Sequence, residues 1–345
     1  MSNSELPGGR ERRELRTAWP AVSRRSFLQS TAAVLAAAYG QNVAAAPGGE
    51  IATAARDRVE GLLIGTFFGD AFGGPIEFQD PLKVHALPDP PKQWAEHERL
   101  DQDGLAAAAA RLRLRSYRDL RPTPEPYGHW ATNAEPGTIT DDSRHKLVLL
   151  GALRDAKANK AWPISEQELA QAYLDWPRGK QIAGRPEYDA ICKEWLAEMQ
   201  LSARWVLGER DLAKARPTER LWVGLPTCCG QMTLPPLAAI YPGQPESAYL
   251  AAYSLAFLDN GFGRDLNAAL VAGLATALVS DVNPRQPDEV WNRIFNSMRR
   301  TDPFGYLQVP WSQRSVDRWL DFALNSVQEA GGCPAKLFAK LDDEF

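Results

Sequence analysis

The chain has 345 residues and a net charge of −4, with 44% hydrophobic and 24% charged residues. Its first 46 residues carry six arginines and three glutamates, so the remainder has a net charge near −7. An acidic surface of this kind argues against nucleic acid or an anionic membrane as the main partner. No stretch after residue 46 approaches about 18 consecutive apolar residues, so we expect no membrane span once the N-terminal segment is removed.

The N-terminal segment has the features of an export signal. Residues 23–28 read Ser-Arg-Arg-Ser-Phe-Leu, a twin-arginine motif, and an apolar run follows at 32–39. Small residues at 43–46 then offer a cleavage site. We therefore predict a twin-arginine signal peptide over 1–46, export to the periplasm or beyond, and a mature domain over 47–345.

The four cysteines do not form a metal or redox motif. They lie at 192, 228, 229 and 333, without a C-x-x-C pair. An exported protein can form disulfides, and four cysteines allow three pairings that the sequence does not distinguish. The adjacent pair Cys228-Cys229 is more typical of a tight packed turn than of a bond.

The first predicted helix of the mature chain, at 51–72, contains a stripe of glycines. Gly61, Gly65, Gly69 and Gly73 recur every fourth residue and therefore share one face of the helix. Each glycine costs roughly 1 kcal/mol of helix propensity relative to alanine. We therefore expect a close approach of another backbone or of a ligand, and overpacking if Gly65 is replaced by leucine.

The rest of the mature chain also predicts helices. Prolines flank a helix at 104–120, so we interpret 80–136 as an insertion or lid. A capping box, Ser165-x-x-Glu168, opens a helix that ends before Pro177. Alternating apolar and polar runs are scarce, which indicates an all-α, single-domain chain. The further expected helices cover 146–158, 187–207, 245–258, 265–280, 287–299 and 313–330.

Two acidic segments are candidates for chemistry. In the first, Asp70 precedes Gly73 and Gly74, and Glu77 follows between apolar neighbours, where a carboxylate has a raised pKa or a cation partner. The second, Thr140-Asp141-Asp142-Ser143, stands directly before an apolar helix. Acids and hydroxyls at a helix start are usually caps, and taken alone this is the favoured explanation. Adjacent carboxylates and hydroxyls are also the hard oxygen ligands that Mg²⁺ prefers.

Together the two segments resemble the ADP-ribosylglycohydrolase family, which includes the dinitrogenase reductase-activating glycohydrolase and the J1 crystallins. Family members open with Gly-x-x-x-Gly-x-x-x-Gly-Asp-Ala-x-Gly and then a Glu, as at 61–77 here. They carry Thr-Asp-Asp-Thr/Ser at the head of a later helix, as at 140–143. A weaker match covers Gly230-Gln231-Met232 and the two prolines at 235–236.

The resemblance implies an orthogonal multi-helix domain that binds two Mg²⁺ ions and hydrolyses the bond joining ADP-ribose to another group. It implies metal ligands at Thr140, Asp141 and Asp142 and an acid/base or water-positioning role for Glu77. The remaining positions, Gly73, Gly74, Asp70 and Ser143, would contact the substrate or support the site; helix capping is an equal alternative for Asp70. The substrate would be an ADP-ribosylated or otherwise ribosylated conjugate. The sequence does not indicate an oligomeric state.

The chain departs from the family pattern in its second half. The middle motif has Cys229 and Thr233 where members usually have asparagine and arginine. The late Asp-x-Asp-Thr/Ser segment is not found after residue 250, although Asp259 and Asp265 are acids that could take its place. We therefore expect at most one weakly held Mg²⁺, little hydrolase activity, and a chain that lacks its C-terminal part. A non-catalytic nucleotide- or sugar-binding or crystallin-like protein is the alternative.

Overall fold

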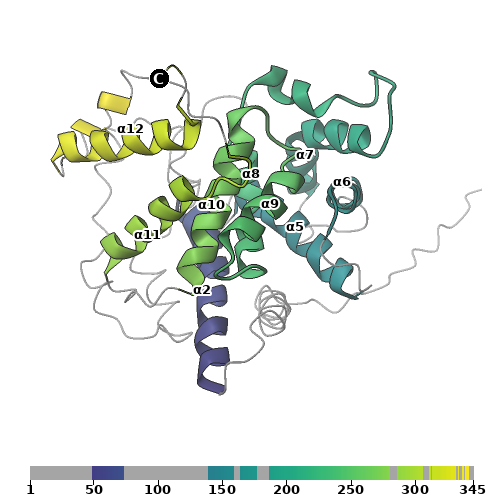
Figure 1. Ribbon diagram of the computed structural model, residues 1–345. Helices are drawn as coiled ribbons and strands as arrows, with labels where there is room; N and C mark the ends of the chain where they lie inside the picture. The colour runs from purple at the N-terminus through teal and green to yellow at the C-terminus, as the bar shows by residue number, and fades with distance from the viewer. Residues whose placement is uncertain are drawn as a thin grey trace, which may run out of the picture.

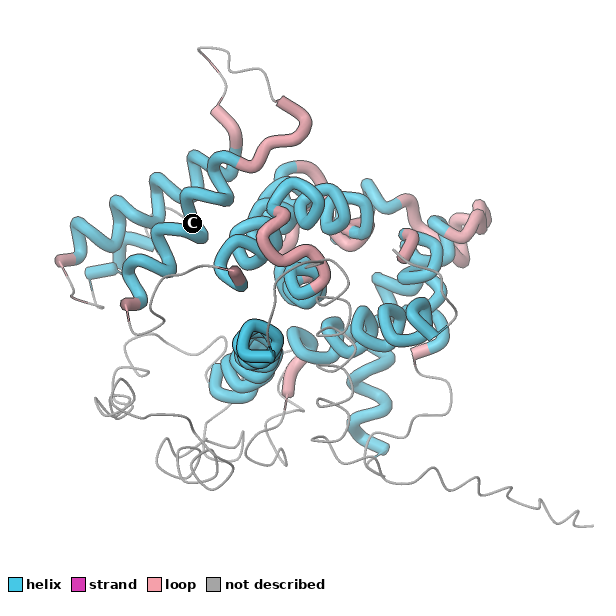
Figure 2. The backbone as a smooth tube through the Cα atoms, turned by 60° about the horizontal axis from the view of Figure 1, so that its bottom comes forward, coloured by secondary structure: helices cyan, strands magenta, loops and turns pink. Residues whose placement is uncertain are grey.

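The computed structural model describes residues 49–73, 139–158, 164–176, 186–279, 286–305, 311, 313–331, 333, 336–337 and 339–341. Within these ranges every regular element is helical (Figure 2), which confirms the all-α class. The predicted signal peptide and the insertion at 80–136 lie outside them. The elements are α2 (Gly49–Gly73), α5 (Asp141–Ala158), α6 (Glu166–Asp175), α7 (Pro186–Val206), η5 (Thr218–Gly224), α8 (Cys229–Thr233), η6 (Pro235–Ala239), α9 (Pro245–Leu255), α10 (Phe262–Leu278), α11 (Pro287–Arg300) and α12 (Ser315–Ala330).

Several helix ends follow from local sequence signals. The Ser165 hydroxyl accepts a hydrogen bond from the amide of Glu168 at 3.2 Å, and the Glu168 carboxylate accepts one from the amide of Ser165 at 2.7 Å. The predicted capping box is therefore confirmed. Pro245 and Pro287 stand at the first positions of α9 and α11, where the missing amide hydrogen is not needed. Gly331 ends α12 in the left-handed conformation with φ of 57°.

Helix α10 is the centre of the fold. It contacts α9, α11, α12, α8, η6 and α2, and Figure 1 shows α11 and α12 on one side of it and α5 to α7 on the other. Six of its ten buried residues are alanine or glycine, which let neighbouring helices approach closely. A Cβ on Gly273 would lie 3.0 Å from the carbonyl oxygen of Ile294 on α11, so this position has no room for a larger residue.

The glycine stripe on α2 does not pack as the sequence predicts. Gly61, Gly65 and Gly69 are exposed, and no described atom lies within 4 Å of the place where a Cβ would stand on any of them. The opposite face of α2 is the buried one, through Val59 and Leu63. The prediction of a close contact with another part of the protein is therefore wrong for these three glycines among the described residues, whereas the approach of a ligand stays a prediction. None of the described helices is long and apolar enough to cross a membrane.

Candidate functional site

Asp70 joins the C-terminal end of α2 to the N-terminal end of α5. Its carboxylate accepts hydrogen bonds from the Thr140 hydroxyl at 2.5 Å, the Thr140 amide at 2.9 Å and the Ser143 amide at 3.2 Å. The first amides of a helix have no partner inside the helix, and an acid placed there also complements the helix dipole. Asp70 therefore caps α5 from another helix, and this bond set brings the two acidic segments together.

Asp141 and Asp142, in the first turn of α5, form a pair of neighbouring carboxylates. Both are partly exposed. Burial raises the pKa of Asp141, and the charges of Asp142 and Asp70 raise it further. Burial also raises the pKa of Asp142, with a further increase from Asp70. The acids therefore repel one another at this helix end, and a bound cation would stabilise their charged forms.

Lys146 is the basic group beside this acidic pair. Its ammonium donates a hydrogen bond to the Asp142 carbonyl at 3.2 Å, and its side chain is buried. Burial lowers the pKa of Lys146, whereas the charges of Asp142, Asp70 and Asp141 oppose that change. Lys146, together with Arg144 next to Asp141, offsets only part of the charge of three carboxylates, which leaves net negative charge at the site. The sequence offered no signal for this role, because a lysine one turn into a helix is usually exposed.

A buried chain of hydrogen bonds holds α8 against α5. Thr233 donates to the carbonyl of Cys229 at 2.8 Å, so its oxygen accepts from the Tyr173 hydroxyl at 3.4 Å. Tyr173 in turn accepts from Nδ1 of His145 at 3.1 Å. Burial lowers the pKa of His145 to about 3, followed by smaller effects of Lys146 and Arg144, so the imidazole is neutral at pH 7. The chain fixes the position of α8 relative to the acidic end of α5.

The turn that leads into α8 carries Cys228 and Cys229. Both thiols are free; Cys228 is exposed and Cys229 is buried, as a tight packed turn requires. Burial raises the pKa of Cys228, and the charges of Asp142, Asp259 and Asp141 raise it further. Cys228 therefore lies in the field of the acidic pair. Burial raises the pKa of Cys229 to about 12, so neither thiol is a reactive thiolate at neutral pH.

The two late acids have other partners. Asp265, in the first turn of α10, accepts two hydrogen bonds from the guanidinium of Arg314 at 2.6 and 2.9 Å and one from the Tyr249 hydroxyl at 2.5 Å. The side chains of this ion pair are only 6% and 8% exposed. Asp259 is 1% exposed and accepts bonds from neutral groups on three residues, Thr227, Gly230 and Asn267. Arg314 already supplies the positive charge that a metal ion would otherwise bring to Asp265.

The chemistry of the donors fits one hard cation at the acidic end of α5. Asp141 and Asp142 provide adjacent carboxylate oxygens, the hard ligands that Mg²⁺ prefers, and burial is the largest cause of the raised pKa of both. Within the described ranges, no three His, Cys, Asp or Glu side chains are arranged to hold a metal ion.

The predicted site residues fall into two groups. The structure brings Asp70, Thr140 and Ser143 into direct contact and places Asp141 and Asp142 beside them. Gly73 is the last residue of α2. Glu77 and Gly74 lie outside the described residues, so their convergence with the acidic pair stays a prediction. The residues that the sequence did not indicate as neighbours of the site are Lys146 and Cys228.

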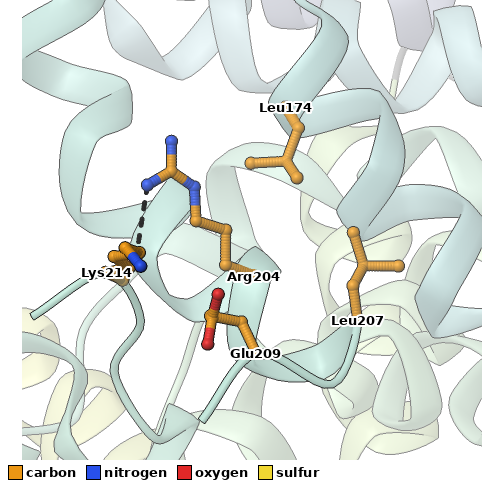
Figure 3. Close-up of a pocket in the computed structure, with 5 residues that line it drawn as sticks. All are labelled: Leu174, Arg204, Leu207, Glu209 and Lys214. Atoms are coloured by element: carbon orange, nitrogen blue, oxygen red, sulfur yellow. Dashed lines mark hydrogen bonds between the residues drawn. The ribbon is translucent and has the colours of Figure 1, made fainter. Parts of the chain in front are cut away.

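A separate surface pocket of about 310 Å³ lies where α6 approaches the end of α7 (Figure 3). Its walls combine two leucines with charged groups, and the Arg204 guanidinium donates a hydrogen bond to the Lys214 carbonyl at 3.4 Å. The pocket shares no residue with the two acidic segments. The lining residues are Leu174, Arg204, Leu207, Glu209 and Lys214.

Comparison with known proteins links this geometry to one family. The family model described as ADP-ribosylglycohydrolase matches residues 52–342. The match covers both acidic segments, the Cys228–Gly230 turn and the late acids. No curated protein matches the chain. No solved structure matches it either.

Proposed function

The chain belongs to the ADP-ribosylglycohydrolase family, and we propose that it is a slow Mg²⁺-dependent hydrolase of ADP-ribosyl or related N- or O-ribosyl conjugates. The observation that carries the proposal is the capping of α5 by Asp70 through Thr140 and Ser143. This arrangement leaves Asp141 and Asp142 as an adjacent, partly exposed carboxylate pair.

In this proposal the residues of α5 hold the ion and the substrate. Asp141 and Asp142 would ligate one Mg²⁺, with the Thr140 hydroxyl beside them. When bound, Mg²⁺ orients ribose hydroxyls and lowers the pKa of a water. Asp70 keeps the helix start rigid, and Lys146 helps to keep the acids ionised when the cation leaves. Glu77 would move the proton at the anomeric carbon, as the family resemblance implies.

We expect slow turnover because two acids in the second half of the chain, Asp259 and Asp265, already have other partners. A two-metal site holds its ions roughly 3.5–4 Å apart and must offset their repulsion with additional carboxylates. Asp265 is committed to Arg314, and the hydrogen bonds of Asp259 are directed to neighbouring backbone and side chains. We therefore expect one Mg²⁺ rather than two.

A second function is binding without hydrolysis. The buried Asp265–Arg314 pair favours it, because an acid neutralised inside the protein cannot activate water through a metal. In that case the chain would bind ADP-ribose or a related nucleotide sugar at the same acidic end of α5. Under either function, export by the twin-arginine signal over 1–46 remains part of the proposal, and secretion of a reporter fused to 1–46 tests it.

Release of ADP-ribose from N-linked and O-linked conjugates tests the proposal. The full chain should release it only with Mg²⁺, and Asp141→Asn and Asp142→Asn should reduce release by at least about tenfold, as expected for a lost charged ligand contact. Asp155→Asn, an exposed acid on the same helix, is the matched control and should retain activity. Binding of ADP-ribose without release would support the second function. Absence of both binding and release would overturn both.

A further inference from the structure

Asp259 is a buried carboxylate surrounded by neutral donors. It lies between α9 and α10 with 1% of its surface exposed. It accepts hydrogen bonds from the Thr227 hydroxyl at 2.5 Å, the Thr227 amide at 3.2 Å, the Gly230 amide at 2.5 Å and the Asn267 amide group at 2.5 Å. Four donors on one carboxylate compensate for much of the cost of burying it. A buried acid with this number of bonds holds its partners in one arrangement.

Two of the three partner residues of Asp259, Thr227 and Gly230, are the two ends of one turn, and the third, Asn267, is on α10. Thr227 and Gly230 enclose the Cys228-Cys229 pair, and the carboxylate closes the turn by binding both ends. A Cβ on Gly230 would lie 2.7 Å from the Asp259 carboxylate, so only glycine fits there. Helix α10 supports the turn as well, because a Cβ on Gly263 would lie 3.2 Å from the Thr227 carbonyl oxygen. The turn is therefore held between Asp259 and the start of α10.

The closed turn also lies near enough to the acidic end of α5 for the charges of Asp142 and Asp141 to act on Cys228. Helix α8 begins at the last residues of the turn and packs against α5. The His145–Tyr173–Thr233 hydrogen bonds fix that packing from the other end of α8. Cys228 is exposed at the turn, and the negative charges of Asp142 and Asp141 reach its thiol. A change in the turn therefore moves a residue that borders the acidic pair.

We propose that Asp259 is a positioning residue of the candidate site: it closes the Thr227–Gly230 turn and so fixes Cys228 beside Asp141 and Asp142. Without it, two backbone amides lose their acceptor and the turn opens. The part of this inference that concerns ligand binding rests on the proposed function. The part that concerns the position of Cys228 does not.

The test compares two threonine-to-valine substitutions. Thr227→Val removes the hydroxyl that donates to Asp259 at 2.5 Å; the same hydroxyl also accepts a longer bond from the Cys229 amide at 3.3 Å. Thr276→Val is the matched control. It removes a hydroxyl at the other end of α10, remote from the turn, where the Thr276 and Ser297 oxygens are 2.7 Å apart. Two quantities are measured on the full chain: the rate at which iodoacetamide modifies Cys228, resolved by peptide mass spectrometry, and the Kd for ADP-ribose with Mg²⁺.

Thr227→Val should raise the rate of Cys228 modification and the Kd for ADP-ribose by about fivefold each, the effect of one hydrogen bond. Thr276→Val should leave both within about twofold of the unmodified chain, even if its melting temperature falls equally. Asp259→Asn should change the Cys228 modification rate and the Kd more than Thr227→Val does. If Asp259→Asn does not fold, the result for Thr227→Val alone tests the role of Asp259. An unchanged Cys228 rate in Thr227→Val would overturn the inference. If the unmodified chain binds no ADP-ribose, the proposed function fails, whereas the Cys228 rates still decide the role of Asp259.

Discussion

The Asp70 carboxylate binds both the amide and the hydroxyl of Thr140, at 2.9 and 2.5 Å, across 70 positions of sequence. It therefore serves as the N-cap of a helix to which it does not belong. This contact links the glycine-rich end of α2 to the acidic start of α5. It also explains why both motifs occur in one chain, since each supplies half of the same junction.

Replacement of Asp70 tests this junction. Asp70→Ala removes the acceptor of three hydrogen bonds and should lower the free energy of unfolding by about 1–3 kcal/mol. Asp70→Asn keeps an oxygen acceptor and relieves repulsion with Asp141, so its loss should be smaller. Urea denaturation measures both, with the exposed Asp155→Ala as control. Equal stability of Asp70→Ala and the unmodified chain would show that the junction does not hold α5.

The exposed glycines of α2 predict a stabilising substitution. Gly65 has open space where a Cβ would stand, and it lies inside a helix. Gly65→Ala should therefore raise the free energy of unfolding by up to about 1 kcal/mol, because alanine has the higher helix propensity. Gly273→Ala, where α11 approaches closely, should instead destabilise the chain. Thermal denaturation distinguishes the two. A loss of stability in Gly65→Ala would mean that the glycine face of α2 is packed, as the sequence predicted.

His145 predicts an acid-dependent loss of stability. Its pKa is lowered to about 3 in the folded chain, against about 6.5 when unfolded. Between these values the unfolded chain binds the proton and the folded chain does not, so stability falls as pH drops from 6.5 towards 3. The slope from this group is at most about 1.4 kcal/mol per pH unit.

Comparison with His145→Gln isolates that slope. The raised pKa values of Asp141, Asp142 and Asp259 act in the opposite direction, because their folded forms bind protons more readily than their unfolded forms. They are present in both proteins, so the difference between the two stability profiles belongs to His145. Urea denaturation at pH 7, 6 and 5 provides the profiles. Parallel profiles for the two proteins would mean that His145 is not buried in its neutral form.

The buried pair of Asp265 and Arg314 predicts a strongly non-additive double substitution. Arg314→Met leaves Asp265 buried without its cation and should cost about 3–5 kcal/mol of unfolding free energy. Adding Asp265→Asn removes the unpaired charge and keeps an acceptor for Tyr249, so the double variant should recover part of the loss. Guanidinium denaturation of the single and double variants measures the coupling. Additive losses would indicate that the two side chains do not form a pair.

Most of the fold follows from periodicity, and the exceptions have local causes. The helices predicted at 187–207 and 287–299 are found at 186–206 and 287–300, because several turns of apolar residues at helical spacing define each one. Helix α8 and the 3-10 helices η5 and η6 were not predicted, since five to seven residues contain too few turns for a periodic pattern. The start of α5 is at Asp141 rather than near Lys146, because Asp70 caps it from a distance.

The candidate site was predictable only where its residues are adjacent in sequence. The acids and hydroxyls at 140–143 indicate a candidate site by their composition alone. The family resemblance then predicted that this run lies near the end of α2. The role of Asp259 depends on donors at 227, 230 and 267, which no local pattern connects. Asp265 is equally ambiguous in sequence, because a carboxylate that binds a metal and one that binds an arginine look the same before folding.

Titration calorimetry of the full chain with Mg²⁺ tests the central claim most directly. The account predicts one binding event, which is lost in both Asp141→Asn and Asp142→Asn and retained in Asp155→Asn. Two equivalents of Mg²⁺ would contradict it, because the account places a single cation at the acidic end of α5. Unchanged binding in Asp141→Asn and Asp142→Asn would contradict it as well, since the cation would then lie away from the acidic end of α5.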